Sequence, residues 1–471
     1  MIQVILLLLS LLLLITGLLN ANMYILTISL FCIYIFDFTA AWRKRNERGV
    51  VLLYLVSFFT FLLGKMLVLT LSGGTWWSVF EYKASIIVVL SIYLALLCLP
   101  IGVRISEKYR IGFGKNRHKE NNDYNTGSIR TNNSRVMSIR RITYRLFWIT
   151  IAATGYNVLH RVFFVLRNSY VEAYLSYGGV NIIISRLADV NKIAFFLYLA
   201  TMPEKEQAKQ PILIWLILNG ISILSGGRST IVITFLVLIY YLIYRNNNLG
   251  TDESPWLTKR MKRVLIIGAP IAVVFLSAWN YLRNGTKIEM GYFDLILNFL
   301  ENQGGSYKHI AYAYTYSDRF PQRWYTFGPV INFLRGNIFV SRIIGFRMPS
   351  QNTVAMATTG YSFGQAVSYI HEPWNYLAGF GMGSCYLAEL YFDFGFIGIA
   401  LFNIILGMVF SRMSRVYNSN VYGIFFMLLI LDSILNLPRN ACLAWFTSLT
   451  SITLWITLAF ITLLIGRNSK S

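Results

Sequence analysis

The sequence is poor in charged residues, in cysteine and in histidine, and each shortage excludes a class of protein. Charged residues make up 13% of the 471 residues, whereas a soluble globular domain carries about 25%, so a soluble fold is excluded. Four cysteines exclude a disulfide-rich scaffold, and we expect Cys385 and Cys442 to be unpaired thiols. With four histidines and no His/Cys/Asp cluster at ligand spacing, we expect no cofactor and no metal, although scattered carboxylates leave Ca²⁺ or Mg²⁺ open.

Apolar residues dominate instead, at 56% of the chain. Apolar runs of about twenty residues recur along its length and can cross the hydrocarbon core of a bilayer. Such segments must be helices, because an open chain in lipid has no other way to pair its backbone polar groups. The sequence therefore predicts an all-α polytopic membrane protein with about twelve spans, of which the sixth is weak: 2–19, 22–41, 49–72, 84–103, 146–166, 188–202, 211–225, 229–244, 264–282, 385–410, 421–437 and 442–466.

The net charge of +22 follows the topology of these spans. The segments that would face one side hold 26 of the 42 lysines and arginines, and 104–145 alone holds eleven. The positive-inside rule assigns this side to the cytoplasm, together with both termini. The basic residues are therefore expected to contact membrane lipids, and we expect no nucleic-acid partner.

One large segment lies outside the membrane in this topology and divides the chain into three parts. Residues 1–282 form nine spans, 283–384 form an outer loop, and 385–471 form three more spans. The loop is rich in aromatic residues and glycine, and its apolar stretches 292–300 and 330–344 are too short or too polar to span. We expect these stretches to be amphipathic helices on the membrane surface.

Arginine dominates the outer face, and its planar fork matches phosphate oxygens. The turn Ser225-Gly226-Gly227-Arg228-Ser229-Thr230 opens a span with free backbone N–H groups, a geometry that binds phosphate. A pyrophosphate ligand is the favoured interpretation, and an arginine surface that contacts lipid headgroups remains the alternative. The candidate substrate-binding arginines are Arg228, Arg283, Arg319, Arg323, Arg335, Arg342 and Arg439.

Acid–base and aromatic candidates lie near the same face. Glu389 and Asp393 are four residues apart just inside the tenth span, so they are expected to share a helix face and to face a polar cavity or an arginine. Glu389 is the first candidate for a general base, and His371 is the next. Aromatic side chains give sugars an apolar platform with a polar edge, and the candidates of this kind are Trp324, Trp374 and Tyr391.

The turn Gly226–Thr230, the long basic outer loop and the run Ala388-Glu389-Leu390-Tyr391-Phe392-Asp393-Phe394-Gly395-Phe396-Ile397-Gly398 together resemble the O-antigen polymerase (Wzy) family. The resemblance implies a GT-C-like glycosyltransferase of the bacterial inner membrane with a periplasmic active site. It further implies that undecaprenyl-pyrophosphate-linked glycans are donor and acceptor and that a chain-length regulator protein is a partner.

Two alternatives remain open. The related O-antigen ligases have a similar layout with a loop histidine, which His371 matches loosely. A lipid-linked oligosaccharide flippase would also have many spans, but its outer loops would be short, so the hundred-residue loop favours an enzyme.

Overall fold

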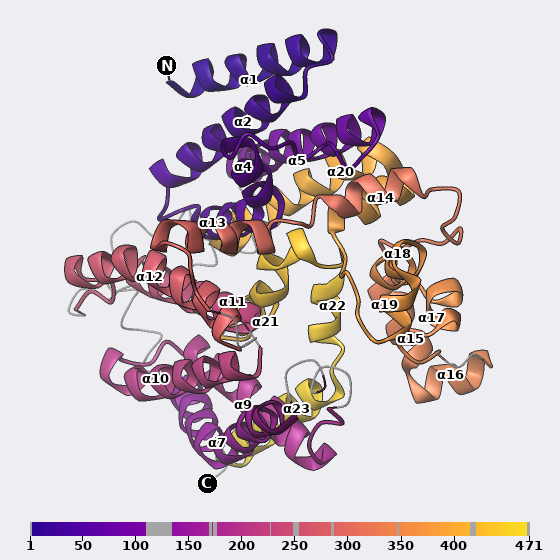
Figure 1. Cartoon of the computed structure of the whole chain (residues 1–471). Coiled ribbons are helices and arrows are strands. Elements are labelled where there is room, and N and C mark those ends of the chain that lie inside the picture. The colour runs from indigo at the N-terminus through magenta and orange to yellow at the C-terminus, as the bar shows by residue number, and fades with distance from the viewer. Residues whose placement is uncertain are drawn as a thin grey trace. The chain divides into compact units, whose positions relative to one another are not determined.

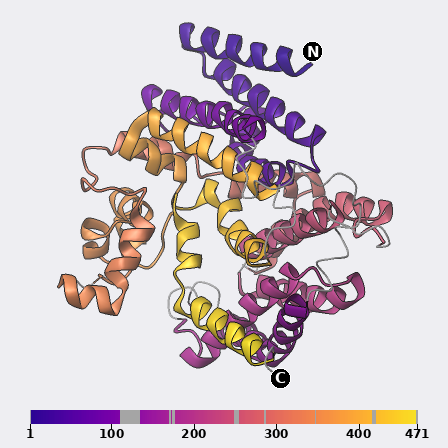
Figure 2. The same ribbon diagram turned by 180° about the vertical axis from the view of Figure 1, so that it is seen from behind.

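The computed structural model describes residues 2–109, 134–168, 172, 177–226, 228–247, 254–283, 287–345, 348–414 and 421–468. These residues form helices and no strands (Figures 1 and 2). Eight of the described helices are long and apolar enough to cross a membrane, and three shorter apolar helices accompany them. The prediction of an all-α polytopic membrane protein is confirmed, whereas the number of twelve spans and the GT-C fold stay predictions.

The chain forms two compact units, and neither is continuous in sequence. Unit 1 contains 1–112, 267–415 and 433–447, and unit 2 contains 113–266, 416–432 and 448–471. The centre of the predicted cytoplasmic loop 104–145 lies outside the described residues, as do residues 248–253. The compact units do not coincide with the predicted division of the chain into 1–282, 283–384 and 385–471. That division concerns the side of the membrane, which the compact units do not test, so it stays a prediction.

Unit 1 begins with the helices of the first four predicted spans and continues with the outer segment. Its first helices are α1 (Ile2–Leu19), α2 (Met23–Arg43), α3 (Gly49–Phe58), a π-helical turn (Phe59–Leu63), α4 (Gly64–Leu71) and α5 (Tyr82–Lys108). The later ones are α13 (Tyr292–Gln303), α14 (Lys308–Thr315), α15 (Gly328–Gly336), α16 (Ile338–Ile344), α17 (Val354–Thr359), α18 (Phe363–His371), α19 (Pro373–Leu377), α20 (Tyr386–Ser414) and the short turn Leu437–Arg439.

The core of unit 1 is the crossing of α5 and α20, where glycines let the two backbones touch. A Cβ atom at Gly102 would overlap the carbonyl oxygen of Ile404, and one at Gly407 would overlap that of Leu99. Small residues at such crossings allow close van der Waals packing between helices in lipid, where no hydrophobic effect drives association. Beside the crossing, Tyr54 donates to the hydroxyl of Tyr386 at 2.8 Å.

Helix α20 is interrupted at Gly395, whose φ of 61° and ψ of −151° are accessible to glycine and not to residues with a Cβ atom. The part from 396 to 414 is about 28 Å long at 1.5 Å per residue, close to the roughly 30 Å of hydrocarbon. Glu389 and Asp393 precede the break. Helix α20 as a whole is long and apolar enough to cross a membrane, in keeping with the predicted tenth span, and its break follows the two carboxylates.

The outer segment is helical where amphipathic helices were predicted. The stretch 292–300 lies in α13, and the stretch 330–344 divides into α15 and α16 at Asn337, whose backbone is extended (ψ of 125°). The turns between these short helices place side chains from 312 to 372 in one region of unit 1, and this region carries the candidate site.

Unit 2 is built on α7 (Ser134–Asn168) and α9 (Ile182–Ala200), with α10 (Lys205–Ile221), the turn Ser222–Ser225, α11 (Arg228–Asn247) and α23 (Ile452–Asn468). Asn191 of α9 donates to the carbonyl of Phe147 of α7 at 2.7 Å, a buried pairing that fixes the two helices. Helix α9 holds three charged residues, which lower its hydropathy and explain its weak signal. Helices α12 (Lys259–Arg283), α21 (Val421–Leu435) and α22 (Ala444–Leu449) have residues in both units.

The last predicted span, 442–466, is not one helix. The structure ends α22 at Leu449 and starts α23 at Ile452. The sequence here is rich in serine and threonine, whose side chains compete for backbone hydrogen bonds. The indole of Trp455 donates to the carbonyl of Leu449 at 2.7 Å, so a side chain satisfies a carbonyl at the helix end.

Candidate functional site

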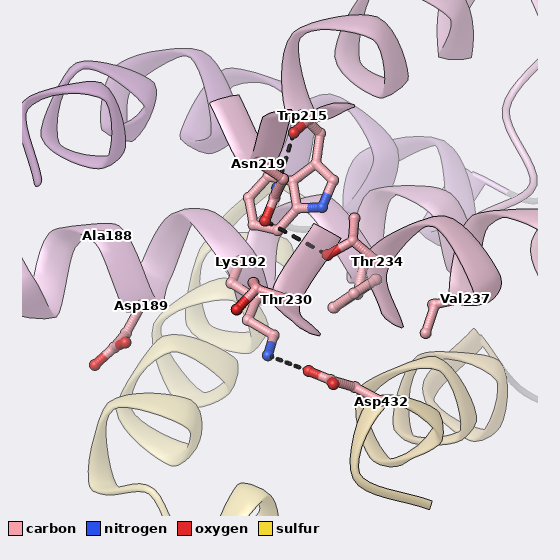
Figure 3. Close-up of a pocket in the computed structure, with 10 residues that line it drawn as sticks. Ala188, Asp189, Lys192, Trp215, Asn219, Thr230, Thr234, Val237 and Asp432 are labelled. Atoms are coloured by element: carbon pink, nitrogen blue, oxygen red, sulfur yellow. Dashed lines mark hydrogen bonds and ion pairs between the residues drawn. The ribbon is translucent and has the colours of Figure 1, made fainter. Parts of the chain in front are cut away.

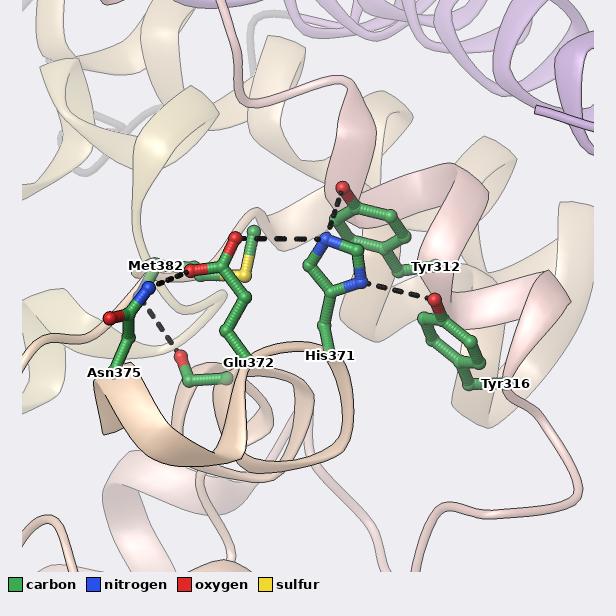
Figure 4. A network of polar contacts seen from close by, with 7 residues as sticks. Tyr312, Tyr316, His371, Glu372, Asn375 and Met382 are labelled. Atoms are coloured by element: carbon green, nitrogen blue, oxygen red, sulfur yellow. Dashed lines mark hydrogen bonds and ion pairs between the residues drawn. The ribbon is translucent and has the colours of Figure 1, made fainter. Parts of the chain in front are cut away.

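His371 is held between two tyrosine hydroxyls at the C-terminal end of α18. Tyr312 lies in the last turn of α14 and Tyr316, four residues on, caps its end, so both side chains project from the same side of the helix. The hydroxyl of Tyr312 is 3.0 Å from Nε2 of His371 and that of Tyr316 is 3.0 Å from Nδ1 (Figure 4). Both imidazole nitrogens are therefore engaged, and the ring can receive a proton only through a tyrosine or by displacing one.

The carboxylate of Glu372 lies near Nε2 of His371 and acts on the ring through its charge. Its Oε1 lies 3.9 Å from Nε2 of His371, and a carboxylate favours the tautomer that carries the proton on that side. Burial, followed by the nearby Tyr316 and Glu372, raises the pKa of Tyr312 to about 12, so its hydroxyl stays neutral. Nδ1 then presents its lone pair to the hydroxyl of Tyr316, which makes Nδ1 the basic end.

A cavity of about 350 Å³ lies beside Glu372. Asn375 donates to Oε2 of Glu372 at 2.8 Å and fixes the carboxylate at the cavity wall. The backbone N–H of Met382 donates to the hydroxyl of Ser368 at 2.9 Å, and both residues line the same cavity. Figure 4 shows Glu372 between the imidazole of His371 and the side chain of Asn375.

An arginine flanks the same chain of groups. The guanidinium of Arg319 lies over the ring of Tyr316, 5.6 Å from its centre, and the side chain of Arg319 is exposed. Tyr316 thus lies between Nδ1 of His371, which contacts its hydroxyl, and the guanidinium of Arg319, which contacts its ring. This arrangement can accept a proton and stabilise a developing anion in the same place.

Two more of the predicted arginines converge on one ring. The guanidinium groups of Arg323 and Arg335 each lie 5.0 Å from the ring centre of Tyr361. Arg335 also donates to the carbonyl of Thr359 at 3.0 Å. Two like charges held at a single aromatic ring repel each other, so an anion with several oxygens would stabilise this pair.

Asp393 holds the loop that carries Arg323. Its two carboxylate oxygens accept the backbone N–H groups of Tyr325 at 3.2 Å and Thr326 at 2.6 Å. The structure thus gives Asp393 a positioning contact, and it does not join Asp393 to the histidine.

Glu389 is buried, with 1% of its surface exposed. Its Oε1 accepts the hydroxyl of Ser384 at 2.6 Å and its Oε2 accepts the backbone N–H of Cys442 at 2.7 Å. The prediction that Glu389 faces a polar cavity or an arginine is therefore wrong. Donors from its own segment and from the 437–442 turn satisfy its charge instead.

The other predicted residues are scattered around these groups. Arg439 donates to Oε1 of Gln303 at 2.5 Å and lies over Phe61, Arg342 and Trp374 are exposed, and Trp324 contacts Phe394. Tyr391 contacts Phe396 through ring edges. The side chains of Arg228 and Arg283 lie outside the described residues.

Sequence reasoning missed how these candidates are grouped. Tyr361 was not a candidate, although it gathers two predicted arginines, and no local pattern distinguishes it from the other tyrosines of the loop. Tyr312 and Tyr316 carried a usable signal, because their four-residue spacing places both hydroxyls on one helix face. In the residues that the structure describes, no group of three metal-ligating side chains comes together.

Comparison with known protein families gives a match over the full length. The model of the family described as O-antigen polysaccharide polymerase Wzy matches residues 1–471. Neither the curated proteins nor the solved structures contain a match.

Proposed function

The chain belongs to the O-antigen polysaccharide polymerase Wzy family, and from this premise we propose that Tyr316, His371 and Glu372 carry the proton transfer of its polymerising reaction. The observation that carries the proposal is that the His371 ring is hydrogen-bonded to Tyr316 through Nδ1, with the Glu372 carboxylate 3.9 Å from Nε2 and Arg319 over the tyrosine ring. A base, its orienting carboxylate and a cation are thereby linked in one stretch of unit 1.

The reaction requires a sugar hydroxyl of the acceptor to attack the anomeric carbon of the donor glycan. A new glycosidic C–O bond forms while the bond from that carbon to the carrier pyrophosphate breaks, and the pyrophosphate leaves with the electron pair. The acceptor proton passes to the oxygen of Tyr316 as the tyrosine gives its own proton to Nδ1 of His371. Glu372 stabilises the imidazolium that results.

Arginine charge supplies the electrostatic stabilisation that a metal ion gives in other transferases. Arg319 lies next to Tyr316, where the leaving pyrophosphate of the donor would develop its charge. The pair at Tyr361 provides a second cationic position for the other lipid-linked substrate. The reaction as proposed therefore needs no metal.

The two carboxylates predicted to be catalytic act as positioning residues in this proposal. Asp393 fixes the backbone before α15 and thereby the segment with Arg323. Glu389 fixes the backbone N–H of Cys442, three residues after Arg439. Both connect spanning helix α20 to segments that carry arginine.

The proposed setting is the periplasmic side of the bacterial inner membrane. The charge bias of the connecting segments supports this orientation, because the positive-inside rule assigns the basic segments to the cytoplasm. Undecaprenyl-pyrophosphate-linked repeat units are the proposed donor and acceptor, and a chain-length regulator is the proposed protein partner.

The experiment compares Tyr316→Phe and His371→Gln with Tyr314→Phe, a matched loss of one hydroxyl elsewhere on α14. Loss of general-base function is expected to lower the turnover of purified enzyme in nanodiscs by about 10²–10⁴-fold, while the affinity for lipid-linked repeat unit stays unchanged. Tyr314→Phe should polymerise normally. Wild-type turnover by Tyr316→Phe would contradict the relay, and wild-type turnover by His371→Gln would remove the proposed base.

A further inference from the structure

Unit 2 contains a polar cavity that the proposed chemistry does not use. It has a volume of about 180 Å³ and lies among α9, α10, α11 and α21. Figure 3 shows Lys192, Asn219, Thr234 and Asp432 directed toward it. Polar and charged side chains within membrane-crossing helices have an energetic cost, so their concentration at one cavity calls for a function.

An ion pair forms one wall of the cavity. Nζ of Lys192 lies 3.1 Å from Oδ2 of Asp432, and both side chains are 40% exposed. Asp189 also lines the cavity and pairs with Arg186 at 3.4 Å. Because Asp432 neutralises Lys192 and Arg186 neutralises Asp189, the two ion pairs leave no net positive charge to attract a phosphate. The cavity therefore suits a neutral polar ligand better than an anion.

The remaining groups both donate and accept hydrogen bonds. Asn219 donates one amide hydrogen to the carbonyl of Trp215 at 2.8 Å, and its Oδ1 receives a long bond of 3.4 Å from the hydroxyl of Thr234. The second amide hydrogen of Asn219 and the lone pairs of Thr234 remain as hydrogen-bonding capacity. A neutral ligand rich in hydroxyl groups matches this mixture, and the side chain of Trp215 adds an apolar wall of the kind that sugar rings contact.

Size and position restrict the ligand further. The volume lies below the roughly 300–1,000 Å³ of pockets for drug-sized molecules, so it fits a single ring better than an oligosaccharide. Thr230, in the first turn of α11, lines the cavity. The predicted topology places this turn, and the adjoining ends of the other three helices, on the periplasmic side.

We propose that this cavity binds one sugar ring of a lipid-linked repeat unit, with hydrogen bonds that Lys192 and Asn219 donate and that Asp432 and Thr234 accept. The inference rests on the polymerase function proposed above and adds a saccharide subsite in unit 2. The subsite contributes to affinity and to the choice of sugar, and it takes no part in proton transfer.

The experiment measures binding to protein in nanodiscs with two probes. One probe is the lipid-linked repeat unit extracted from a strain without the polymerase, and the other is undecaprenyl pyrophosphate alone. Thr234→Val removes one hydroxyl and should weaken binding of the repeat unit about fivefold, the scale of one hydrogen bond, without changing binding of the bare carrier. Thr457→Val is the matched control, because its hydroxyl bonds only within α23 at Thr453.

A charge reversal separates the subsite from a purely structural ion pair. Lys192→Asp combined with Asp432→Lys keeps an ion pair, so the thermal stability should match that of the wild type, while affinity for the repeat unit should fall about tenfold. Wild-type affinity in this double variant and in Thr234→Val would overturn the proposal, as would an equal loss for both probes. If the double variant does not fold, Thr234→Val decides alone.

The two proposals fail in different measurements. A His371→Gln variant should bind the repeat unit normally and turn over slowly, whereas the cavity variants should bind it weakly and retain turnover at saturating substrate. If the cavity variants bind the repeat unit as tightly as the wild type while His371→Gln still turns over slowly, only the subsite proposal is overturned.

Discussion

Glu389 illustrates how two hydrogen bonds define the role of a side chain. It accepts the hydroxyl of Ser384 and the backbone N–H of Cys442 within a buried environment. A glutamine has the same length and can keep both contacts, because its carbonyl accepts the N–H while its amide donates to the serine oxygen. A leucine fills the space and leaves the N–H of Cys442 without a partner.

We therefore predict that Glu389→Gln retains stability and polymerisation, whereas Glu389→Leu loses about 1–3 kcal/mol of unfolding free energy. Thermal unfolding in detergent measures the stability, and the lipopolysaccharide ladder of a complemented deletion strain measures the polymerisation. A Gln variant as stable as wild type that makes no polymer would show that the carboxylate takes part in the chemistry, as the sequence alone predicted.

The crossing of α5 and α20 is the element on which unit 1 depends. The obstructing atom at Gly102 is a backbone carbonyl oxygen of Ile404, which cannot rotate away as a side chain can. Gly268 in α12 provides the contrast, since nothing lies within 4 Å of a Cβ atom placed there.

We predict that Gly102→Ala lowers the midpoint of thermal unfolding, because the helices must separate to admit one methyl group. Gly268→Ala should leave the midpoint unchanged or raise it, since alanine favours a helix by about 0.5–1 kcal/mol over glycine. Both variants are measured in the same detergent by loss of soluble monomer on heating. An equal midpoint for the two would show that the crossing is looser than the structure has it.

The elements that the sequence could predict are those defined by local hydropathy. Several long apolar runs gave helices within a few residues of their predicted ends, as for α1 and α2, whereas α7 begins twelve residues before its predicted span. The break at Gly395 was not predictable, since several other glycines lie within helices without interrupting them. The pairing of Lys192 with Asp432 was also missed, although a charged residue in an apolar run is itself a signal of a polar partner.

The site was predictable in its residue types and not in its groupings. Arginines and His371 were selected because pyrophosphate and acid–base chemistry need them. The pairing of each arginine with an aromatic ring depends on contacts between segments that are distant in the sequence, such as that of Arg335 with Tyr361. No pattern within the sequence specifies such contacts. Burial of Glu389 likewise depends on Cys442, which lies 53 residues further along the chain.

The orientation of the whole molecule is testable by chemical labelling. We predict that a cysteine at Asn302 reacts with a membrane-impermeant thiol reagent in cells with a permeabilised outer membrane, whereas one at Asn121 does not. Asn302 is an exposed residue of α13 and Asn121 lies outside the described residues. The background lacks the four native cysteines, and lysed cells, in which both positions should react, are the control. Labelling of Asn121→Cys in unlysed cells would reverse the topology.

The interleaving of the two units has a consequence for how the protein is made. Helix α5 leaves the ribosome early, but the surface around Gly102 finds its partner only when residues near Ile404 have been synthesised. At about 5–20 residues per second the delay is on the order of tens of seconds. During this time unit 2 lacks its last segments as well, so neither half can mature ahead of the other. The newly made helices must wait in the bilayer with their contact faces open to lipid or to the insertion machinery, and the final residues of the chain complete both units almost together.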